Sequence, residues 1–260
     1  MRPLALVTGS WRRIGAHIAV RLAERGYDLA LHAGHDVSPE AWLVDALARH
    51  GAEHRLFVAD LRDPAAVEPL VPRAAEAFGR RVELLVNNAS RFEALAGDAL
   101  PAMAELIDYF AVNAAAPLAL ARAVAGGGGA AVVNILDQRV RNPPRDQLAY
   151  TISKQALAEG TRTLAVALAP HVRVNGVAPG LTLPTDDYAP GQLEALSGAM
   201  PLRRLPSPHD IADAVAYLAA ARSVTGCTIF VDGGAHLAPF ERDFVNLQRP
   251  HGPSESITNR

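Results

Sequence analysis

The stretch "LALVTGSWRRIGAHIAVRLAERG", residues 4–26, decides the fold class. Its first residues are apolar enough for a buried strand, and from Ile14 onward the apolar residues recur with helical spacing. Gly9 permits a tight turn, and Gly15 lets the helix begin close to the strand. A helix N-terminus offers free backbone N–H groups that attract phosphate. The stretch therefore predicts a strand, a phosphate-binding turn and a helix, or else a turn whose glycines serve geometry alone.

Short apolar runs alternate with longer helical patterns along the rest of the chain. We expect strands at 4–9, 29–33, 54–59, 83–88, 130–136, 172–178 and 227–233. We expect helices at 14–25, 39–49, 64–78, 101–125, 147–169 and 208–221. Nearly continuous apolarity is typical of strands in a parallel sheet that is buried on both faces. The alternation predicts an α/β fold, a doubly wound parallel sheet of the Rossmann type with about seven strands and helices on both faces.

The 260 residues are expected to form one main domain, residues 1–240. Within it, residues 182–206 are rich in Pro, Thr and Asp with a weak helix near 190–199, which indicates a flap. Residues 241–260 form a tail that ends in the polar sequence "RPHGPSESITNR". We expect this tail either to be disordered or to be held at a subunit interface.

Composition excludes several classes of function. A net charge of −2 predicts no attraction to nucleic acid. The single cysteine, Cys227, rules out an intrachain disulfide, agrees with a reducing cytoplasm, and is expected to be packed in an apolar strand. No signal peptide and no apolar stretch long enough to cross a membrane is expected. No spacing of His, Cys and Asp indicates a metal site.

A second stretch, "VVNILDQRVRNPPRDQLAYTISKQAL" at 132–157, ends a strand and opens a helix. Tyr150 and Lys154 lie four positions apart on that helix and therefore share a face. A tyrosine has an ordinary pKa of about 10, and a nearby ammonium group lowers it. The pair therefore predicts a phenol that donates or accepts a proton near neutral pH.

The end of the second strand, "LHAGHD", bears on the choice of dinucleotide cofactor. An NAD-binding fold places a carboxylate near Ala33 to bond the ribose 2′-hydroxyl. No acid occurs until Asp36, which we place in the following loop. Arg12, His32 and His35 supply donors that suit a 2′-phosphate. The sequence therefore favours NADP(H) over NAD, and Asp36 is the residue that argues most against this choice.

Further motifs follow one another in a fixed order. They are "TGSWRRIG" (8–15), Asp60 of "VADL", "NNAS" (87–90), Asn113 of "VNAAAP", "YTISK" (150–154), "VRVNGVAPG" (172–180) and "VDGG" (231–234). With these motifs the chain resembles the short-chain dehydrogenase/reductases over about residues 3–238. The resemblance implies a cofactor bound by Gly9, Arg12, Arg13, Ile14, Gly15, His32, Asp60, Leu61, Asn87, Ala89, Ser90, Lys154, Pro179, Gly180 and Thr182.

The same resemblance implies individual roles. Asp60 would approach the adenine, and Lys154 would bond the ribose. Asn113 would hold a proton-relay water through the kinked helix that carries it. Relatives form tetramers through the helices at 101–125 and 147–169, so we expect a homotetramer. The nicotinamide amide would be flanked by Pro179, Gly180 and Thr182.

Asp137 departs from the general family pattern, which has serine at this position. The pteridine reductases resemble this chain in three departures at once. They have Asp where Asp137 stands, Arg where Arg13 stands, and the pattern N-N-A-S-x-F, as at 87–92. The resemblance thus implies a reductase of a pterin or dihydropterin.

The residue types agree with reduction of a C=N bond, which requires hydride at carbon and a proton at nitrogen. Asp137 beside Tyr150 predicts a relay in which the carboxyl draws a proton from solvent and the phenol passes it on. Phe92 would stack on the flat ring, while Ser90 and Arg13 would bond its polar edge. The charge of Asp137 also raises the pKa of a neighbouring tyrosine unless it is offset.

Two alternatives remain open from the sequence. One is a carbonyl reductase or alcohol dehydrogenase of the same family with an unusual Asp. The other is a catalytically silent NADP-binding protein in which Asp137 is a solvated loop residue. The presence of Tyr150, Lys154 and Asn113 argues against the silent protein.

Overall fold

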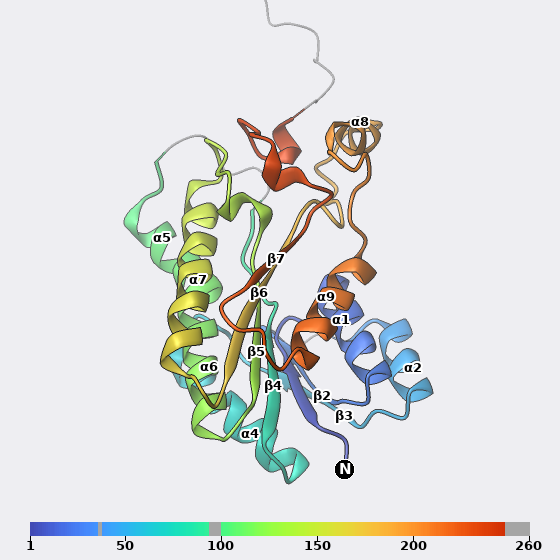
Figure 1. Ribbon diagram of the computed structural model, residues 1–260, viewed down its shortest axis with the longest axis vertical. Coiled ribbons are helices and arrows are strands. Elements are labelled where there is room, and N and C mark those ends of the chain that lie inside the picture. Colours follow the sequence, from blue (N-terminus) through green and yellow to red (C-terminus); the bar gives the residue numbers. More distant parts are fainter. Residues whose placement is uncertain (36–37, 94–99, 248–260) are drawn as a thin grey trace, which may run out of the picture.

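The computed structural model describes residues 1–35, 38–93 and 100–247, so Asp36 lies outside the described residues. A seven-stranded parallel sheet forms its centre, in the order β3-β2-β1-β4-β5-β6-β7 (Figure 1). The strands are β1 (Leu4–Val7), β2 (Asp28–Ala33), β3 (His54–Val58), β4 (Val82–Asn87), β5 (Ala131–Ile135), β6 (Arg173–Pro179) and β7 (Thr228–Val231). The predicted doubly wound α/β fold is therefore confirmed.

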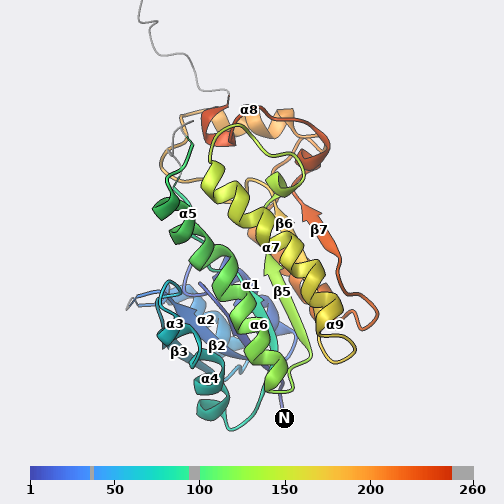
Figure 2. The ribbon, with the colours of Figure 1, turned by 90° about the vertical axis from the view of Figure 1, so that its left-hand side faces the viewer.

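Helices cover both faces of the sheet (Figures 1 and 2). One apolar cluster joins the sheet to α1 (Arg13–Glu24), α2 (Ala41–Arg49) and α9 (Pro208–Ala220). The cluster on the other face joins it to α3 (Pro64–Val67), α4 (Leu70–Phe78), α6 (Ala116–Gly126) and α7 (Leu148–Ala167). α5 (Met103–Phe110) runs into α6 and packs beside α7 in the same layer, while α8 (Gln192–Ala199) lies at one end of the sheet (Figures 1 and 2).

Two expected helices are interrupted. Pro69 has no N–H to continue the helical hydrogen bonding, so the helix expected at 64–78 divides into α3 and α4. The helix expected at 101–125 contains a π-turn, η1 (Ala111–Ala115), between α5 and α6. π-turns often mark functional sites, and this one carries Asn113.

The edge strands depart from the expectation of burial on both faces. In β3, Leu56 and Val58 are 44% and 40% exposed, on the face opposite that of the buried Phe57. Every residue of β7 is only partly buried. Cys227, which precedes β7, is an exposed free thiol, so the expected packing role is wrong.

One helical run reaches the length of a membrane span. Met103–Gly126 has a mean hydropathy of 1.2, and 33% of its most apolar window is buried. The expectation of no such stretch was therefore wrong by length and composition. The half formed by α6 packs Leu120, Ala121 and Val124 into the core between helices and sheet. Burial of this kind is what the core helix of an ordinary domain requires, so the run is weak evidence for a membrane span.

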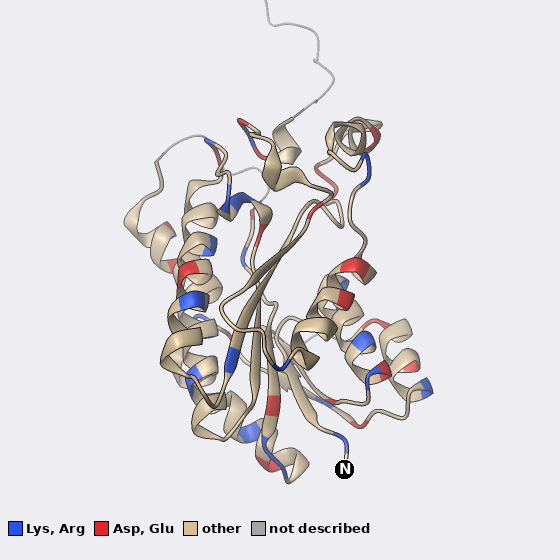
Figure 3. Ribbon diagram, in the orientation of Figure 1, with Lys and Arg blue, Asp and Glu red and all other residues tan. Residues whose placement is uncertain are grey.

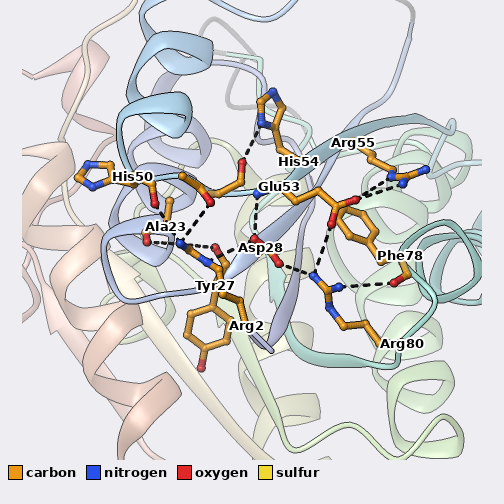
Figure 4. A network of polar contacts seen from close by, with 12 residues as sticks. Arg2, Ala23, Tyr27, Asp28, His50, Glu53, His54, Arg55, Phe78 and Arg80 are labelled. Carbon is orange, nitrogen blue, oxygen red and sulfur yellow. Dashed lines mark hydrogen bonds and ion pairs between the residues drawn. The ribbon is translucent and has the colours of Figure 1, made fainter.

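Charged side chains lie mostly on helices and loops, and most of each strand carries none (Figure 3). An exception is Asp28 at the start of β2, which is 6% exposed. Its carboxylate accepts a hydrogen bond from the backbone N–H of Glu53 (2.8 Å) and pairs with Arg2 Nε at 3.3 Å. Arg80 pairs with the other oxygen (Figure 4). This network ties the amino-terminal ends of β1, β2 and β4 together, at the end of the sheet opposite α8.

Asp28→Ala is expected to lower the free energy of unfolding by about 3 kcal/mol, because it leaves Arg2 and Arg80 without their buried counter-charge. Urea unfolding followed by circular dichroism measures the change. The exposed Asp45 of α2 supplies the matched control, since Asp45→Ala should change stability by less than about 0.5 kcal/mol. Equal effects of the two substitutions would contradict the role given to the network.

Candidate active site

A cleft of about 850 Å³ opens at the carboxyl ends of the strands. It lies where the strand order reverses between β1 and β4, the usual ligand position in open α/β sheets. Two of the predicted site residues, Asn87 and Asn113, do not line it. The predicted residues that do line it are Gly9, Arg12, Arg13, Ile14, Gly15, His32, Asp60, Leu61, Ala89, Ser90, Phe92, Asp137, Tyr150, Lys154, Pro179, Gly180 and Thr182.

The turn after β1 leaves a space that side chains would fill. Gly9 has φ +62°, and a Cβ there would lie 2.9 Å from Cα of Ala89. A Cβ on Gly15 would lie 2.2 Å from the carbonyl oxygen of Gly9. Arg12, the N-cap of α1, makes no side-chain cap, and the first turn contains no acid. The helix N-terminus is thus open to an anion, and the cradle fits the diphosphate of a dinucleotide.

Asn88, and not the predicted Asn87, shapes this turn. The Asn88 side-chain amide donates hydrogen bonds to the carbonyl oxygens of Thr8 and Gly9, both at 2.9 Å. Asn87 is 2% exposed, and its amide donates to Oδ1 of Asn134 at 2.8 Å. Asn87 therefore joins β4 to β5 beneath the cleft, away from a bound cofactor.

His32 holds the turn from below and is not free to bind a 2′-phosphate. The backbone N–H of Gly9 donates to Nδ1 at 3.2 Å, so the proton of the neutral ring lies on Nε2, which donates to the carbonyl of Ala59 at 2.9 Å. Burial lowers the pKa of His32 and disfavours its cation. The remaining cationic candidates at this end of the cleft include the exposed Arg12 and His35.

Asp60 follows β3 and lines the cleft beside a residue that sequence reasoning missed. Arg62 donates hydrogen bonds to its carboxylate, from Nη2 to Oδ2 at 2.7 Å and from Nε to Oδ1 at 3.0 Å. These hydrogen bonds hold the pKa of Asp60 below its usual value. Arg62 also lines the cleft, so an adenosine at this end would meet a paired acid and guanidinium.

At the other end of the cleft, Asp137 and Tyr150 meet directly. The Tyr150 hydroxyl donates to Oδ2 of Asp137 at 3.0 Å. Asp137 reaches this place because it directly follows Leu136 at the end of β5, while Tyr150 lies in the first turn of α7. Burial, followed by the charge of Asp137, raises the pKa of Tyr150 well above its ordinary value. The phenol is therefore protonated at neutral pH. The expectation that a neighbouring cation lowers its pKa toward neutrality was wrong, because burial and the charge of Asp137 outweigh that effect.

Lys154 lies one helical turn beyond Tyr150, as the sequence predicts. It is 2% exposed, and its Nζ donates to the carbonyl of Ile135 at 2.8 Å. Burial lowers the pKa of Lys154 to about 8. An ammonium has three donors, so this contact leaves donors for a ribose.

The cation that lowers the Tyr150 pKa in this structure is Arg139, which sequence reasoning missed. Its guanidinium lies 4.7 Å from the centroid of the Tyr150 ring and 5.6 Å from that of Phe92. Nε donates to Oδ1 of Asp137 at 2.9 Å. "DQRVRNPPR" contains several arginines within a few positions, and no local spacing distinguishes the one that turns inward.

Asn113 organises the loop that follows β4. Its Oδ1 accepts a hydrogen bond from the backbone N–H of Arg91 (2.8 Å) and one from the Ser90 hydroxyl (3.2 Å). Its Nδ2 donates to the hydroxyl of Ser153 at 3.0 Å. Phe92 follows in this loop and is 38% exposed, and its ring centroid lies 4.8 Å from that of Tyr150 in an edge-to-face arrangement. Asn113 thus places Ser90 and Phe92 at the cleft from a fully buried position.

The flap expected at 182–206 covers one side of the cleft, and α8 confirms the helix expected near 190–199. Arg13 ties it to the phosphate turn, because its Nη2 donates to the carbonyl of Leu183 at 2.9 Å. Tyr188 also lines the cleft, and burial raises the pKa of its phenol.

The described part of the tail, residues 241–247, folds onto the same end of the molecule as α8 (Figures 1 and 2). Gln192 of α8 donates to the carbonyls of Phe244 (3.0 Å) and Leu247 (2.6 Å). Asp243 lies in the cleft lining and pairs with Arg139 at 2.5 Å. The folded part therefore extends past the domain boundary expected at residue 240. No local sequence signal predicted where residues 241–247 pack.

The chain is similar to known proteins over most of its length. The family model described as enoyl-(acyl carrier protein) reductase matches residues 9–236. A Streptomyces violaceoruber protein, named as a ketoacyl reductase of granaticin polyketide synthase, is 36% identical over 90% of this chain and 96% of its own. Pteridine reductase 1 of Leishmania tarentolae is 31% identical over 90% of this chain and 96% of its own. FolM alternative dihydrofolate reductase 1 from Brucella canis, a crystal structure with NADP, has a TM-score of 0.81 at 38% identity and covers 91% of this chain and 95% of that chain.

Proposed function

Because this chain belongs to the short-chain dehydrogenase/reductase family and is an oxidoreductase, we propose that it reduces the C=N bond of a pterin or dihydropterin with NADPH. The observation that carries this proposal is the hydrogen bond from the Tyr150 hydroxyl to Asp137. A serine suffices to hold a ketone oxygen. A carboxyl adds the capacity to take up a proton and supply it to the phenol.

When bound, NADPH supplies the hydride. The glycine cradle and the open N-terminus of α1 would hold its diphosphate. Lys154 would bond the ribose, and the strand end at 179–182 would border the nicotinamide. Tyr150 would give its proton to the ring nitrogen of the substrate, and Asp137 would then take up a proton from solvent and pass it to Tyr150. The high pKa of Tyr150 suits the reductive direction, since the phenol starts protonated.

The substrate would lie between the nicotinamide position and Phe92. Phe92 exposes enough of its ring to cover a flat heterocycle. Ser90 lines the cleft beside it and carries a hydroxyl that can bond the amino-oxo edge of a pterin. Arg13 reaches the same space from the phosphate turn. A ring held on both faces loses little further orientational freedom on reaction.

Specificity for NADP(H) rests on charge at the adenosine end. The position of Ala33 carries no acid that would repel a 2′-phosphate, and Arg12 and His35 are exposed beside it. The similar FolM protein was crystallised with NADP. His32 is withdrawn from this role because both of its ring nitrogens are used within the protein.

Turnover of a dihydropterin, followed by the loss of NADPH absorbance, tests the proposal. We expect oxidation of NADPH with dihydrobiopterin at a rate well above that with simple ketones, and a much weaker reaction with NADH. The second candidate, a carbonyl reductase, is favoured by the likeness to the named ketoacyl reductase. Faster turnover of ketones would support that candidate, and cofactor binding without any turnover would support a silent NADP-binding protein.

Assembly and location are also proposals. Apolar side chains on one side of α5 and α7 remain exposed, among them Met103 (76%), Ile107 (59%) and Val166 (81%). A homotetramer would cover such a surface. Light scattering of the purified chain measures the mass, and a monomer would contradict this assignment. A cytoplasmic location agrees with the exposed free thiol of Cys227.

A further inference from the structure

A buried row of charges runs from the C-terminal segment to the proton donor. Asp243 Oδ2 accepts a hydrogen bond from Arg139 Nη2 at 2.5 Å, and Arg139 Nε donates to Asp137 Oδ1 at 2.9 Å. The opposite oxygen of Asp137 accepts the Tyr150 hydroxyl at 3.0 Å. The exposed fraction of the side chain is 4% for Asp243 and 6% for Arg139. Burying a guanidinium is costly, and the two carboxylates that flank this one offset that cost.

The arrangement divides the two oxygens of Asp137 between two tasks. Oδ1 accepts from both the backbone N–H (3.0 Å) and the Nε of Arg139, which fixes the rotation of the carboxyl group. Oδ2 is thereby directed at Tyr150. The guanidinium lies over the rings of Tyr150 and Phe92, and its Nη1 has no hydrogen-bond partner in the described residues. Arg139 thus contacts Asp137, Tyr150 and Phe92 without being able to give up a proton itself.

Asp243 is in turn held by segments far away in the sequence. Its backbone N–H donates to Oδ1 of Asp146 at 2.7 Å, in the loop before α7. Asn246 donates to the other oxygen of Asp146 at 2.8 Å. Gln192 of α8 donates to the carbonyls of Phe244, Val245 and Leu247. The C-terminal segment is therefore anchored both to the flap and to the helix that carries Tyr150.

We propose that Arg139 is a positioning residue that holds Asp137 against Tyr150, and that Asp243 of the C-terminal segment is its anchor. The inference rests on the proposed proton relay, and it adds residues 241–247 to the active site. These residues complete the site from beyond the end of the family match at 236.

Steady-state kinetics of Arg139→Gln, Arg139→Lys and Asp243→Asn test the proposal in the full chain. Misplacement of a reacting group by about 1 Å costs on the order of 10²-fold in rate. We expect a kcat loss of that order for Arg139→Gln and about tenfold for Asp243→Asn, with partial recovery in Arg139→Lys. The dissociation constant for NADPH should change by less than about twofold, because none of these atoms belongs to the phosphate turn. Arg141→Gln, at an exposed arginine of the same loop, is the matched control and should keep the wild-type kcat.

A double-mutant cycle separates positioning from damage to the fold. In an Asp137→Asn background, Arg139→Gln should cost almost nothing further, because Arg139 acts through Asp137. An equal loss in both backgrounds would overturn the proposal. A crystal structure of Arg139→Gln gives an answer that does not depend on turnover: Asp137 should rotate away from the Tyr150 hydroxyl, and an unchanged hydrogen bond would also overturn it. If wild type reduces ketones and no pterin, the proposed substrate fails, while the cycle and the crystal structure still decide the role of Arg139.

Discussion

Tyr150→Phe is expected to lower kcat for dihydropterin reduction by about 10²–10⁴-fold, the usual range for loss of a general acid. The substitution removes only the hydroxyl that Asp137 holds at 3.0 Å, and the ring continues to pack against Phe92 and Arg139. NADPH affinity should remain within about twofold, since the cradle of α1 is untouched. Single-turnover absorbance measurements with saturating NADPH give the rate of the chemical step.

The matched control for this experiment is Tyr217→Phe, which makes the same change at a 58% exposed tyrosine of α9. Its kcat should equal that of the wild type. Retention of full activity by Tyr150→Phe would show that the proton comes from another group, and the proposed mechanism would then have to be abandoned.

Asp137→Ser, which restores the residue general in the family, is expected to lower dihydropterin turnover by about 10²-fold or more, because the phenol loses its proton supply. Turnover of a ketone should fall far less. Asp137→Asn keeps the shape of the side chain and separates the loss of proton capacity from the loss of packing. Rates for both substrates, measured in parallel for the three proteins, give the comparison. Unchanged pterin turnover in both variants would defeat the relay.

The pH dependence of the same variants carries an independent signature. The charge of Asp137 raises the pKa of Tyr150, so removal of that charge lowers it. Burial lowers the pKa of Lys154 to about 8 although the charge of Asp137 raises it, and Lys154 therefore loses its proton before Tyr150 does. Reduction requires both protonated groups, so the rate declines as the pH rises through these pKa values. The alkaline decline should begin at a lower pH in Asp137→Asn than in wild type, and a decline at the same or a higher pH would contradict the contact.

Local sequence pattern was sufficient to predict most of the fold and part of the candidate site. Strand and helix periods predicted the parallel sheet, since each depends on residues that are near one another in the chain. The spacing of Tyr150 and Lys154 predicted their common helix face for the same reason. The glycines of the first turn predicted a cradle, because only a residue without a side chain fits positions where a Cβ would meet backbone at 2.2 Å.

Local pattern did not predict the hydrogen-bond partners of the polar side chains. Sequence reasoning selected Asn87 where packing selects Asn88, and it gave His32 a ligand role that the structure replaces with two backbone contacts. Asn87 and Asn88 have the same chemistry, and a histidine suits either a phosphate or a backbone partner. Only the direction in which each side chain points distinguishes these possibilities. That direction depends on which face of a strand meets the neighbouring strand, which local spacing leaves open.

The sequence by itself determined the sheet, the glycine turn after β1, and the order of an acid, a phenol and an amine along the chain. Tertiary structure alone decided what surrounds the acid. Arg139 was one arginine among several nearby, and Asp243 reaches it across 104 positions of sequence. A charged side chain forms an ion pair with an opposite charge that the fold brings within about 4 Å. Packing between segments far apart in the sequence decides which charge that is.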